Sequence, residues 1–255
     1  MSLSGARASN RPGVLLHIGF HKTGTTSIQY WLRDHEDFLA EHGVRFPRGW
    51  LRLNNHFELP LTLMRPDRMM NGRRRGDEWR DAAWRAAVLE QVRDDLARHR
   101  DMLTILSAED LCLFRFDDEI APLRELVGDA EVVAYRRRPS DFLASMAAHY
   151  RKDGMPGLSL DPDAYNYLAA GSWRADYFTL LQGWRRHFRR VWSPSYDAMT
   201  LRDGSVIPSF LRHIELPVPA DVLDYRLNRR ADDVPRAEGN RQTTGLRFGE
   251  VPAVT

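Results

Sequence analysis

The chain of 255 residues is 43% hydrophobic and 28% charged, a composition suited to one globular domain with a sizeable core. Its 37 basic and 35 acidic residues leave a formal net charge of +2, which excludes a strongly basic, nucleic-acid-binding tail. The single cysteine, Cys112, excludes a disulfide framework and a cysteine-based zinc cluster, and it indicates a reducing compartment. No apolar run approaches the roughly 20 residues that span a bilayer, and residues 1–13 lack the apolar stretch of a signal peptide. We therefore expect a cytoplasmic protein with no membrane span and no nucleic-acid partner.

The first predicted element is a buried strand over 14–18, which reads Val-Leu-Leu-His-Ile. A loop that contains Gly24 follows, and apolar residues then recur at helical spacing over 28–39. Strand, glycine-bearing loop and helix in this order are typical of the opening of an α/β unit. The next segment, 40–76, contains several prolines and is predicted to be irregular apart from a short strand at 44–46.

Helices and strands alternate along the rest of the chain. The apolar spacing predicts an amphipathic helix over 77–100 and a second helix over 140–151. Short apolar runs predict strands at 103–106, 131–135 and 190–192. Strands separated by helices indicate an α/β fold, in which a central parallel β-sheet is flanked by helices on both faces.

These elements form one predicted domain over 14–227. It follows a flexible N-terminus at 1–13 and precedes a polar tail at 228–255, part of which we expect to be disordered. Ligands of parallel sheets bind beyond the carboxyl ends of the strands, so the loops that follow the predicted strands are the candidate functional segments.

The loop after the first predicted strand, called the first loop below, covers 19–27 and reads Gly-Phe-His-Lys-Thr-Gly-Thr-Thr-Ser. Because it joins a strand to a helix, its backbone N–H groups and the positive end of the helix dipole are expected to point at one spot. Gly24 allows an anion to approach the backbone closely, and the hydroxyl groups beside it add donors. The first loop therefore predicts a binding site for a phosphate or sulfate ester.

The position of the lysine distinguishes the first loop from a Walker A loop, whose lysine directly follows the second glycine. Here that position holds Thr25, and Lys22 comes two residues before Gly24. This departure counts against an ordinary nucleoside triphosphatase. Lys22 is also one of only two lysines among the 37 basic residues, the other being Lys152.

The first loop resembles the 5′-phosphosulfate-binding loop of the sulfotransferases, which use 3′-phosphoadenosine 5′-phosphosulfate (PAPS) as the sulfuryl donor. Its form His-Lys-Thr-Gly-Thr-Thr is similar to that of many bacterial sulfotransferases. The resemblance implies the three-layer α/β/α sulfotransferase fold, which is like that of the P-loop NTPases. The residues that it implies in donor binding are His21, Lys22, Thr23, Gly24, Thr25, Thr26 and Ser27.

Two residues of the first loop receive separate predictions. An ammonium beside the bridging oxygen of the leaving nucleotide is the main electrostatic requirement of sulfuryl transfer, so Lys22 is the predicted catalytic cation. Positive charge in the loop is expected to lower the pKa of His21, whose expected role is that of a structural hydrogen-bond donor.

A second motif follows the strand predicted at 131–135. Arg137-Arg138-Pro139, with Ser145 eight residues after Arg137, resembles the 3′-phosphate-binding motif of the sulfotransferases. An arginine at the carboxyl end of a strand and a serine on the next helix can both reach one phosphate. Because Arg136 and Arg138 flank the matched position, an ambiguity of one residue remains.

Transfer to a hydroxyl or amine also requires a general base. Several families of sulfotransferases place a His or Glu just after the strand that precedes the Arg-x-Pro strand, and here Ser107-Ala108-Glu109-Asp110 occupies that position. We therefore expect Glu109 to be the base, with Asp110 behind it, while helix capping is the alternative interpretation. His56 is the second candidate, because an imidazole in an acceptor-side loop titrates in the right range.

Together these motifs predict a PAPS-dependent sulfotransferase that acts by in-line displacement on a small-molecule or carbohydrate acceptor. No metal is expected, because the reaction of the family needs none. Segments 40–76 and 152–180 are expected to line the acceptor pocket. One alternative is a small-molecule kinase of the P-loop type, in which Glu109 or Asp110 holds magnesium, and another is a catalytically silent nucleotide-binding module with the same fold. The sequence leaves the acceptor and the oligomeric state open.

Overall fold

The computed structural model describes residues 13–49, 54–65, 68, 81–152, 159–164, 166–169 and 171–225. In these ranges five strands form one sheet in the order β2-β3-β1-β4-β5. All neighbouring strands are parallel. The strands are β1 (Val14–Gly19), β2 (Val44–Arg45), β3 (Leu103–Ser107), β4 (Glu131–Ala134) and β5 (Arg190–Trp192).

Strand β1 lies at the centre of the sheet, where Leu16 is in register with Leu106 of β3 on one side and with Val132 of β4 on the other. All its residues are buried, because helices cover both faces of a parallel sheet. Leu16 packs into the core on one face, and Leu15 packs into the core on the other. This central position brings the loop after β1 next to the loops after β3 and β4.

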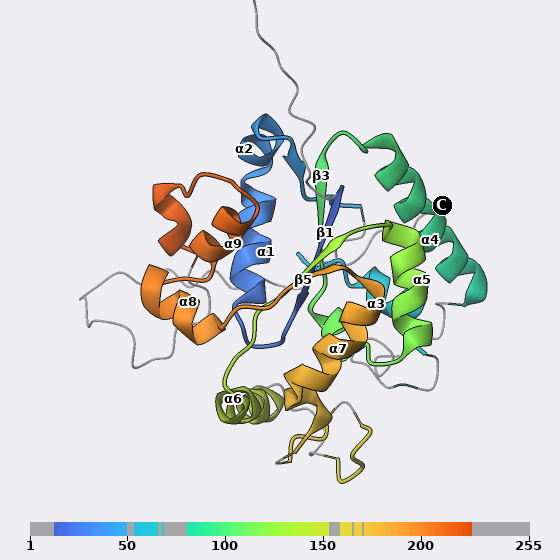
Figure 1. Ribbon diagram of the computed structural model, residues 1–255, viewed down its shortest axis with the longest axis vertical. Coiled ribbons are helices and arrows are strands. Elements are labelled where there is room, and N and C mark those ends of the chain that lie inside the picture. The colour runs from blue at the N-terminus through green and yellow to red at the C-terminus, as the bar shows by residue number, and fades with distance from the viewer. Residues whose placement is uncertain are drawn as a thin grey trace, which may run out of the picture.

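Two helical layers enclose the sheet, as Figure 1 shows. One layer comprises α1 (Thr25–Asp34), α2 (Glu36–Glu41), α8 (Tyr196–Asp203) and α9 (Ile207–His213). The other comprises α3 (Glu58–Leu63), α4 (Ala82–Arg98), α5 (Asp117–Val127) and α7 (Tyr177–His187). The predicted three-layer α/β architecture with a parallel sheet is therefore confirmed.

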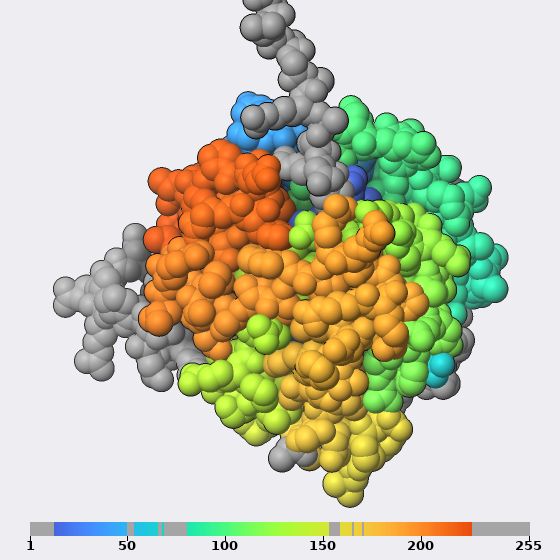
Figure 2. Space-filling model, in the orientation of Figure 1, coloured from blue at the N-terminus to red at the C-terminus, as the bar shows by residue number. Residues whose placement is uncertain are grey.

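A smaller group of elements lies beyond the carboxyl ends of the strands. Helix α6 (Pro139–Lys152), below the sheet in Figure 1, follows β4 directly, and the 3₁₀ helix η4 (Trp173–Ala175) packs against it. Phe142, Met146 and Tyr150 of α6 form a separate apolar cluster with Leu168. This cluster holds α6 where ligands of parallel sheets bind. The space-filling view in Figure 2 shows α6 packed together with residues 159–164, 166–169 and 171–176 at this end of the molecule.

The prediction that 40–76 is irregular apart from one strand is wrong for Glu58–Leu63, which form α3. Pro60 lies in the first turn of this helix, where a missing N–H and a fixed φ are tolerated, so it does not break the helix. The helix predicted over 77–100 is α4, which begins at Ala82 with Asp81 as its N-cap, and residues 77–80 of the prediction lie outside the described residues. Apart from Gly13, the predicted flexible N-terminus and the polar tail at 228–255 lie outside the described residues.

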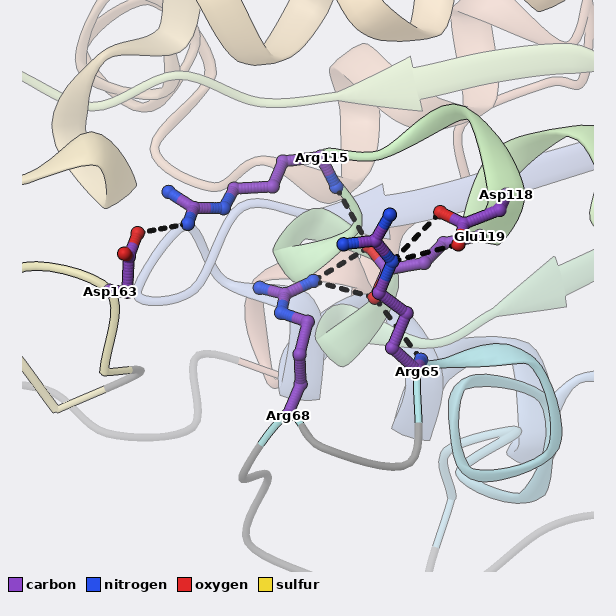
Figure 3. Close-up of polar contacts among 6 residues, drawn as sticks. All are labelled: Arg65, Arg68, Arg115, Asp118, Glu119 and Asp163. Atoms are coloured by element: carbon purple, nitrogen blue, oxygen red, sulfur yellow. Dashed lines mark hydrogen bonds and ion pairs between the residues drawn. The ribbon is translucent and has the colours of Figure 1, made fainter.

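The buried carboxylate of Glu119, in α5, accepts hydrogen bonds from Arg65, Arg68 and Arg115, as Figure 3 shows. Glu119 is fully buried and accepts hydrogen bonds from the backbone N–H groups of Arg65 (3.2 Å) and Arg115 (3.1 Å). The guanidinium of Arg68 donates to both its oxygens, at 2.8 and 2.6 Å. Because a buried carboxylate is stable only when it is paired and hydrogen-bonded, these donors hold Arg65 and Arg68 against α5.

Candidate functional site

The first loop crosses the carboxyl end of β1 and is held there by backbone hydrogen bonds to the end of β4. Phe20 N–H donates to Tyr135 O (3.1 Å), and Tyr135 N–H donates to Gly19 O (2.7 Å). The hydroxyl of Thr23 is buried and donates to the carbonyl of Phe20. The path of the loop is therefore set by the neighbouring strand and by its own side chain.

Gly24 is required at the start of α1 for two reasons. Its φ of 76° lies in the left-handed region, which favours glycine. A Cβ at this position would also lie 2.8 Å from Val206 Cγ1, closer than atoms can pack. Lys22 has a left-handed φ of 63° as well, a conformation that is uncommon for residues other than glycine.

The first turn of α1 exposes a positive helix end to the loop. Among the described side chains, none caps α1, and its first turn contains no acidic residue. Its first N–H groups and the helix dipole therefore remain directed at the space in front of the first loop. Thr25, Thr26 and Ser27 form this first turn; Thr25 and Ser27 are buried and Thr26 is half-buried.

Arg137 brings the second motif to the first loop. Its Nη1 donates a hydrogen bond to the backbone carbonyl of Lys22 (3.3 Å), and its Nε lies 3.9 Å from Asp197 Oδ1. Arg136 and Arg138 are exposed and bond instead to Ser193 O and to Asp141. Of the three arginines, Arg137 is thus the one whose side chain contacts the first loop.

Ser145 lies half-buried on α6, the helix that begins at Pro139. Tyr196, at the start of α8, lies beside Gly24 and below the guanidinium of Arg137, whose Cζ is 5.6 Å from the ring centre. The segments after β4 and after β5 therefore both reach the first loop, through Arg137 and Tyr196.

Glu109 and Asp110 begin the 3₁₀ helix η3 (Glu109–Leu113) directly after β3. Glu109 is half-buried, and its Oε2 accepts a 2.7 Å hydrogen bond from Thr25 Oγ1. Ser107 does not cap this helix: its Oγ is within 2.9 Å of His17 Nδ1 and of Gln29 Nε2. The position of Glu109 beside the first loop is therefore not explained by capping.

His56 lies in the loop before α3, whose Asn55 and Phe57 line a cavity, but its own side chain is fully buried. Its Nδ1 accepts a hydrogen bond from Ser107 N–H (2.9 Å), and its Nε2–H donates to Pro47 O (2.8 Å). Burial lowers its pKa to about 4. Both ring nitrogens are engaged by the backbone, which gives His56 the contacts of a neutral core residue.

His21 points away from the helix end and towards η3. Its Nε2 donates to Asp110 Oδ1 (2.9 Å), and its Nδ1 lies 3.1 Å from Cys112 Sγ. Burial alone would lower the pKa of His21, but the electrostatic attraction of Cys112 and the hydrogen bond to Asp110 hold it well above its usual value. The predicted lowering is therefore wrong, because the acidic partner comes from a neighbouring loop.

Sequence reasoning missed this link between His21, Asp110 and Cys112. A signal was present, since His21 is the second residue after β1 and Asp110 follows β3, the strand beside β1. Side chains from adjacent carboxyl ends of parallel strands meet at one edge of the sheet.

A cavity of about 90 Å³ adjoins Glu109 on the side of α6. His21, Glu109 and Asp110 form one wall, and Tyr150 of α6 and Arg174 of η4 form another. Phe57 of segment 40–76 and Arg174 of segment 152–180 line this cavity, and α6 contributes to it as well. The cavity therefore lies where three strand-end segments meet.

Comparisons with known proteins identify the fold. No protein-family model and no curated protein sequence matches the chain. Among solved structures, the chain is similar to a sulfotransferase from Alicyclobacillus acidocaldarius, with a TM-score of 0.53, 16% identity and 87% of each chain covered. It is also similar to the sulfotransferase domain of the curacin biosynthetic pathway, with a TM-score of 0.51, 11% identity, and 86% of this chain and 79% of that chain covered. The chain has the α/β fold of the sulfotransferases.

The described residues also bear on membrane insertion and on metal binding. No helix in these ranges is long and apolar enough to cross a membrane. Over the same part of the chain, no group of three or more His, Cys, Asp or Glu side chains is arranged to hold a metal ion.

Proposed function

We propose that this protein is a sulfotransferase, which moves the sulfuryl group of PAPS to a hydroxyl or amine of a small-molecule or carbohydrate acceptor. The observation that carries the proposal is the hydrogen bond from Arg137 Nη1 to Lys22 O. It joins two motifs that lie 115 residues apart and that both match anion-binding motifs of the sulfotransferases. The free, buried Cys112 fits the cytoplasmic location that we propose with it.

The first loop would hold the 5′-phosphosulfate. The uncapped N-terminus of α1, with the backbone of Gly24 and Thr25, and the hydroxyls of Thr26 and Ser27 supply the donors for it, while the hydroxyl of Thr25 donates to Glu109. Lys22 would stabilise the negative charge that develops on the bridging oxygen as the sulfur–oxygen bond breaks. His21 and Thr23 would hold the first loop in place. His21 donates a hydrogen bond to Asp110, and Thr23 donates one to the carbonyl of Phe20.

The 3′-phosphate of the donor would bind to Arg137 and Ser145. A guanidinium presents a fork of N–H groups that matches phosphate oxygens. Its existing hydrogen bond to Lys22 O keeps this fork beside the first loop before the donor arrives. One nucleotide would thus contact both motifs at once.

Glu109 would be the general base. It lies between the first loop, through Thr25, and the cavity beside α6, which would receive the acceptor. The acceptor oxygen attacks sulfur in line with the leaving nucleotide, and its proton passes to Glu109. We place His56 outside the reaction, because the backbone occupies both of its ring nitrogens.

A small-molecule kinase is the second candidate, and one contact favours it. A hydroxyl and a carboxylate beside an anion-binding loop, here Thr25 and Glu109, are ligands that Mg²⁺ takes in P-loop enzymes. The position of Lys22, before rather than after Gly24, favours the sulfotransferase. A catalytically silent nucleotide-binding module is the third reading of the same fold.

One set of measurements separates these functions. Calorimetry compares binding of 3′-phosphoadenosine 5′-phosphate (PAP) with binding of ATP in the presence of magnesium. Turnover is then followed with labelled PAPS and with labelled ATP over one panel of alcohols, phenols, amines and sugars. Tight PAP binding with sulfuryl transfer supports the proposal, transfer from ATP alone supports the kinase, and PAP binding without any transfer supports the silent module.

A further inference from the structure

Lys22 holds an uncommon backbone conformation within the first loop. Its φ of 63° lies in the left-handed region, which a residue with a side chain rarely adopts. Such a conformation persists only where the surrounding structure holds it in place. The directions open to a side chain depend on its backbone dihedral angles. The groups that hold this backbone therefore also decide where the ammonium of Lys22 can reach.

One of these groups is the guanidinium of Arg137. Its Nη1 donates a 3.3 Å hydrogen bond to the backbone carbonyl of Lys22. This carbonyl belongs to the planar peptide unit between Lys22 and Thr23, so its direction is set by the ψ angle of Lys22. A hydrogen bond to the carbonyl oxygen thus restricts rotation about that angle from the side of β4.

Arg137 can support the first loop because the segment after β5 fixes its own position. The backbone N–H of Tyr196 donates to Arg136 O (2.7 Å), and that of Arg138 donates to Asp197 Oδ2 (3.2 Å). The guanidinium lies over the ring of Tyr196, with 5.6 Å from Cζ to the ring centre, and its Nε is 3.9 Å from Asp197 Oδ1. The side chain of Arg137 is only 16% exposed. A support of this kind has little freedom to move away from the loop.

The guanidinium has more donors than this contact uses. It carries five N–H groups in a fixed planar fork, and the bond to the carbonyl of Lys22 uses a single donor of Nη1. The remaining N–H groups can bind phosphate oxygens while this bond is kept. One side chain can therefore bind the 3′-phosphate and hold the first loop at the same time.

We propose that Arg137 is a positioning residue for Lys22, whose backbone it holds so that the ammonium lies at the bridging oxygen of the donor. This inference rests on the proposed sulfotransferase function. In the transfer, the acceptor oxygen forms the new bond to sulfur and its proton passes to Glu109. The bond from sulfur to the bridging oxygen breaks, and this oxygen keeps the electron pair beside the ammonium of Lys22. Arg137 forms no bond in this step and acts through the position of Lys22.

Binding of the 3′-phosphate and positioning of Lys22 affect different kinetic constants. A contact with the 3′-phosphate is equally present in the bound donor and in the transition state, so its loss raises KM and leaves kcat unchanged. A misplaced ammonium stabilises the transition state less, so its loss of position lowers kcat. The second effect does not require a 3′-phosphate on the donor.

The test compares two donors, PAPS and adenosine 5′-phosphosulfate, which lacks the 3′-phosphate, with an acceptor identified in the panel described above. We expect Arg137→Ala to lower kcat at least about tenfold with each donor, because misplacement of a catalytic group by about 1 Å can cost about 10²-fold. If the unaltered protein uses PAPS alone, kcat at saturating PAPS is the deciding value. An unchanged kcat, with only the KM for PAPS raised, would overturn the inference.

Binding of adenosine 5′-phosphate shows whether the first loop keeps its fold. Calorimetry should give nearly the same affinity for the unaltered protein and for Arg137→Ala, since the helix end that binds the 5′-phosphate is intact. If Arg137→Ala loses this binding, Arg137→Met takes its place, because methionine fills space beside Tyr196 but donates no hydrogen bond. The same fall in kcat is expected for it, and an unchanged kcat refutes the proposal.

A double-mutant cycle assigns the loss to Lys22. With Lys22→Ala there is no ammonium to place, so the further change Arg137→Ala should lower kcat by less than about twofold. A further loss as large as in the unaltered protein would show that Arg137 does not act through Lys22. Arg138→Ala, at the exposed neighbouring arginine, is the matched control and should keep kcat with both donors.

Rescue by a conservative variant separates positioning from general damage. Arg137→Lys keeps a charged donor that can reach the carbonyl of Lys22, so its kcat should lie above that of Arg137→Ala. An equally low kcat in both variants argues against the hydrogen bond as the cause. Failure of the proposed function has a different signature. Absence of PAP binding and of any PAPS turnover in the unaltered protein refutes the sulfotransferase, whereas normal turnover with an unchanged kcat in Arg137→Ala refutes only the positioning role.

Discussion

Thr25 Oγ1 donates a 2.7 Å hydrogen bond to Glu109 Oε2 and thereby links the helix that follows β1 to the 3₁₀ helix that follows β3. The two strands are neighbours in the sheet, so their carboxyl ends lie side by side. This contact holds the proposed base at the border between the first loop and the cavity. Glu109 is thus hydrogen-bonded to the start of α1 and also lines the cavity beside α6.

Removal of the ammonium of Lys22 should affect the rate far more than the fold. We expect Lys22→Ala to lower kcat by about 10²–10³-fold, the usual effect of losing one group that stabilises transition-state charge. Its melting temperature should stay near that of the unaltered protein. Lys152→Ala, which removes the exposed lysine at the end of α6, is the matched control and should keep its activity. A near-normal kcat for Lys22→Ala would falsify the assignment.

Arg137 should discriminate between nucleotides with and without a 3′-phosphate. Loss of a charge-assisted hydrogen bond is worth about 1.5–3 kcal/mol, so Arg137→Ala should weaken PAP binding by about 10–100-fold and hardly change binding of adenosine 5′-phosphate. Ser145→Ala should act in the same direction, but less. Arg138→Ala, an exposed neighbour, serves as the control in the same calorimetric titrations. If both nucleotides weaken equally in Arg137→Ala, the second motif does not bind the 3′-phosphate.

Glu109→Gln tests the base. The amide cannot accept a proton, so kcat should fall by about 10²-fold or more, while PAP affinity measured by calorimetry stays near its original value. Thr25→Ser, which keeps a hydroxyl for Glu109, should retain most of the activity and controls for disturbance of the first loop. An active Glu109→Gln together with an inactive His56→Gln would instead make His56 the base.

His56 should make stability depend on pH. Its pKa is about 4 in the folded protein and near 6.5 in the unfolded chain, so the unfolded chain binds more protons between these values. Stability from this residue is complete above about pH 6.5 and is lost as the pH falls towards 4, by about 3 kcal/mol over that window. Urea unfolding of the unaltered protein and of His56→Gln, at several pH values, measures the difference. A difference that does not change with pH would show that His56 is not buried in its neutral form.

Glu119 should be important for stability and not for chemistry. Removal of one partner of a buried ion pair costs about 3–5 kcal/mol, because it leaves the other charge buried and uncompensated. We expect a loss of this size for Glu119→Gln in urea unfolding, since Arg68 and two backbone N–H groups depend on this carboxylate, as Figure 3 shows. Asp118→Asn, at the exposed partner of Arg65, should cost less than about 1 kcal/mol. Equal losses in the two variants would contradict the role assigned to Glu119.

The sheet could be predicted from the sequence, because buried parallel strands are short apolar runs, and the two motifs could be placed because they directly follow these strands. The strand predicted at 14–18 is β1, and the one predicted at 131–135 is β4, one residue shorter. Side-chain environments depend on contacts between distant segments, and these were not predictable. His56 has a polar, loop-like sequence context, yet the backbone of Pro47 and Ser107 encloses it.

The residues that line the cavity could not be predicted for the same reason. Arg174 is one arginine among many in the sequence, and only the packing of η4 against α6 sets it apart as a buried one. Glu109, in contrast, could be predicted, because its position directly after β3 is itself a sequence feature.

The central position of β1 also bears on how the chain reaches its native state. Arg137 can meet Lys22 only after β4 has paired with β1, a contact that closes more than a hundred residues of chain. Closure of such a loop is entropically unfavourable and slows folding. A nascent chain that has not yet emerged beyond β4 has the first loop without its arginine. The two motifs can therefore come together only after β1 and β4 have paired at the centre of the sheet.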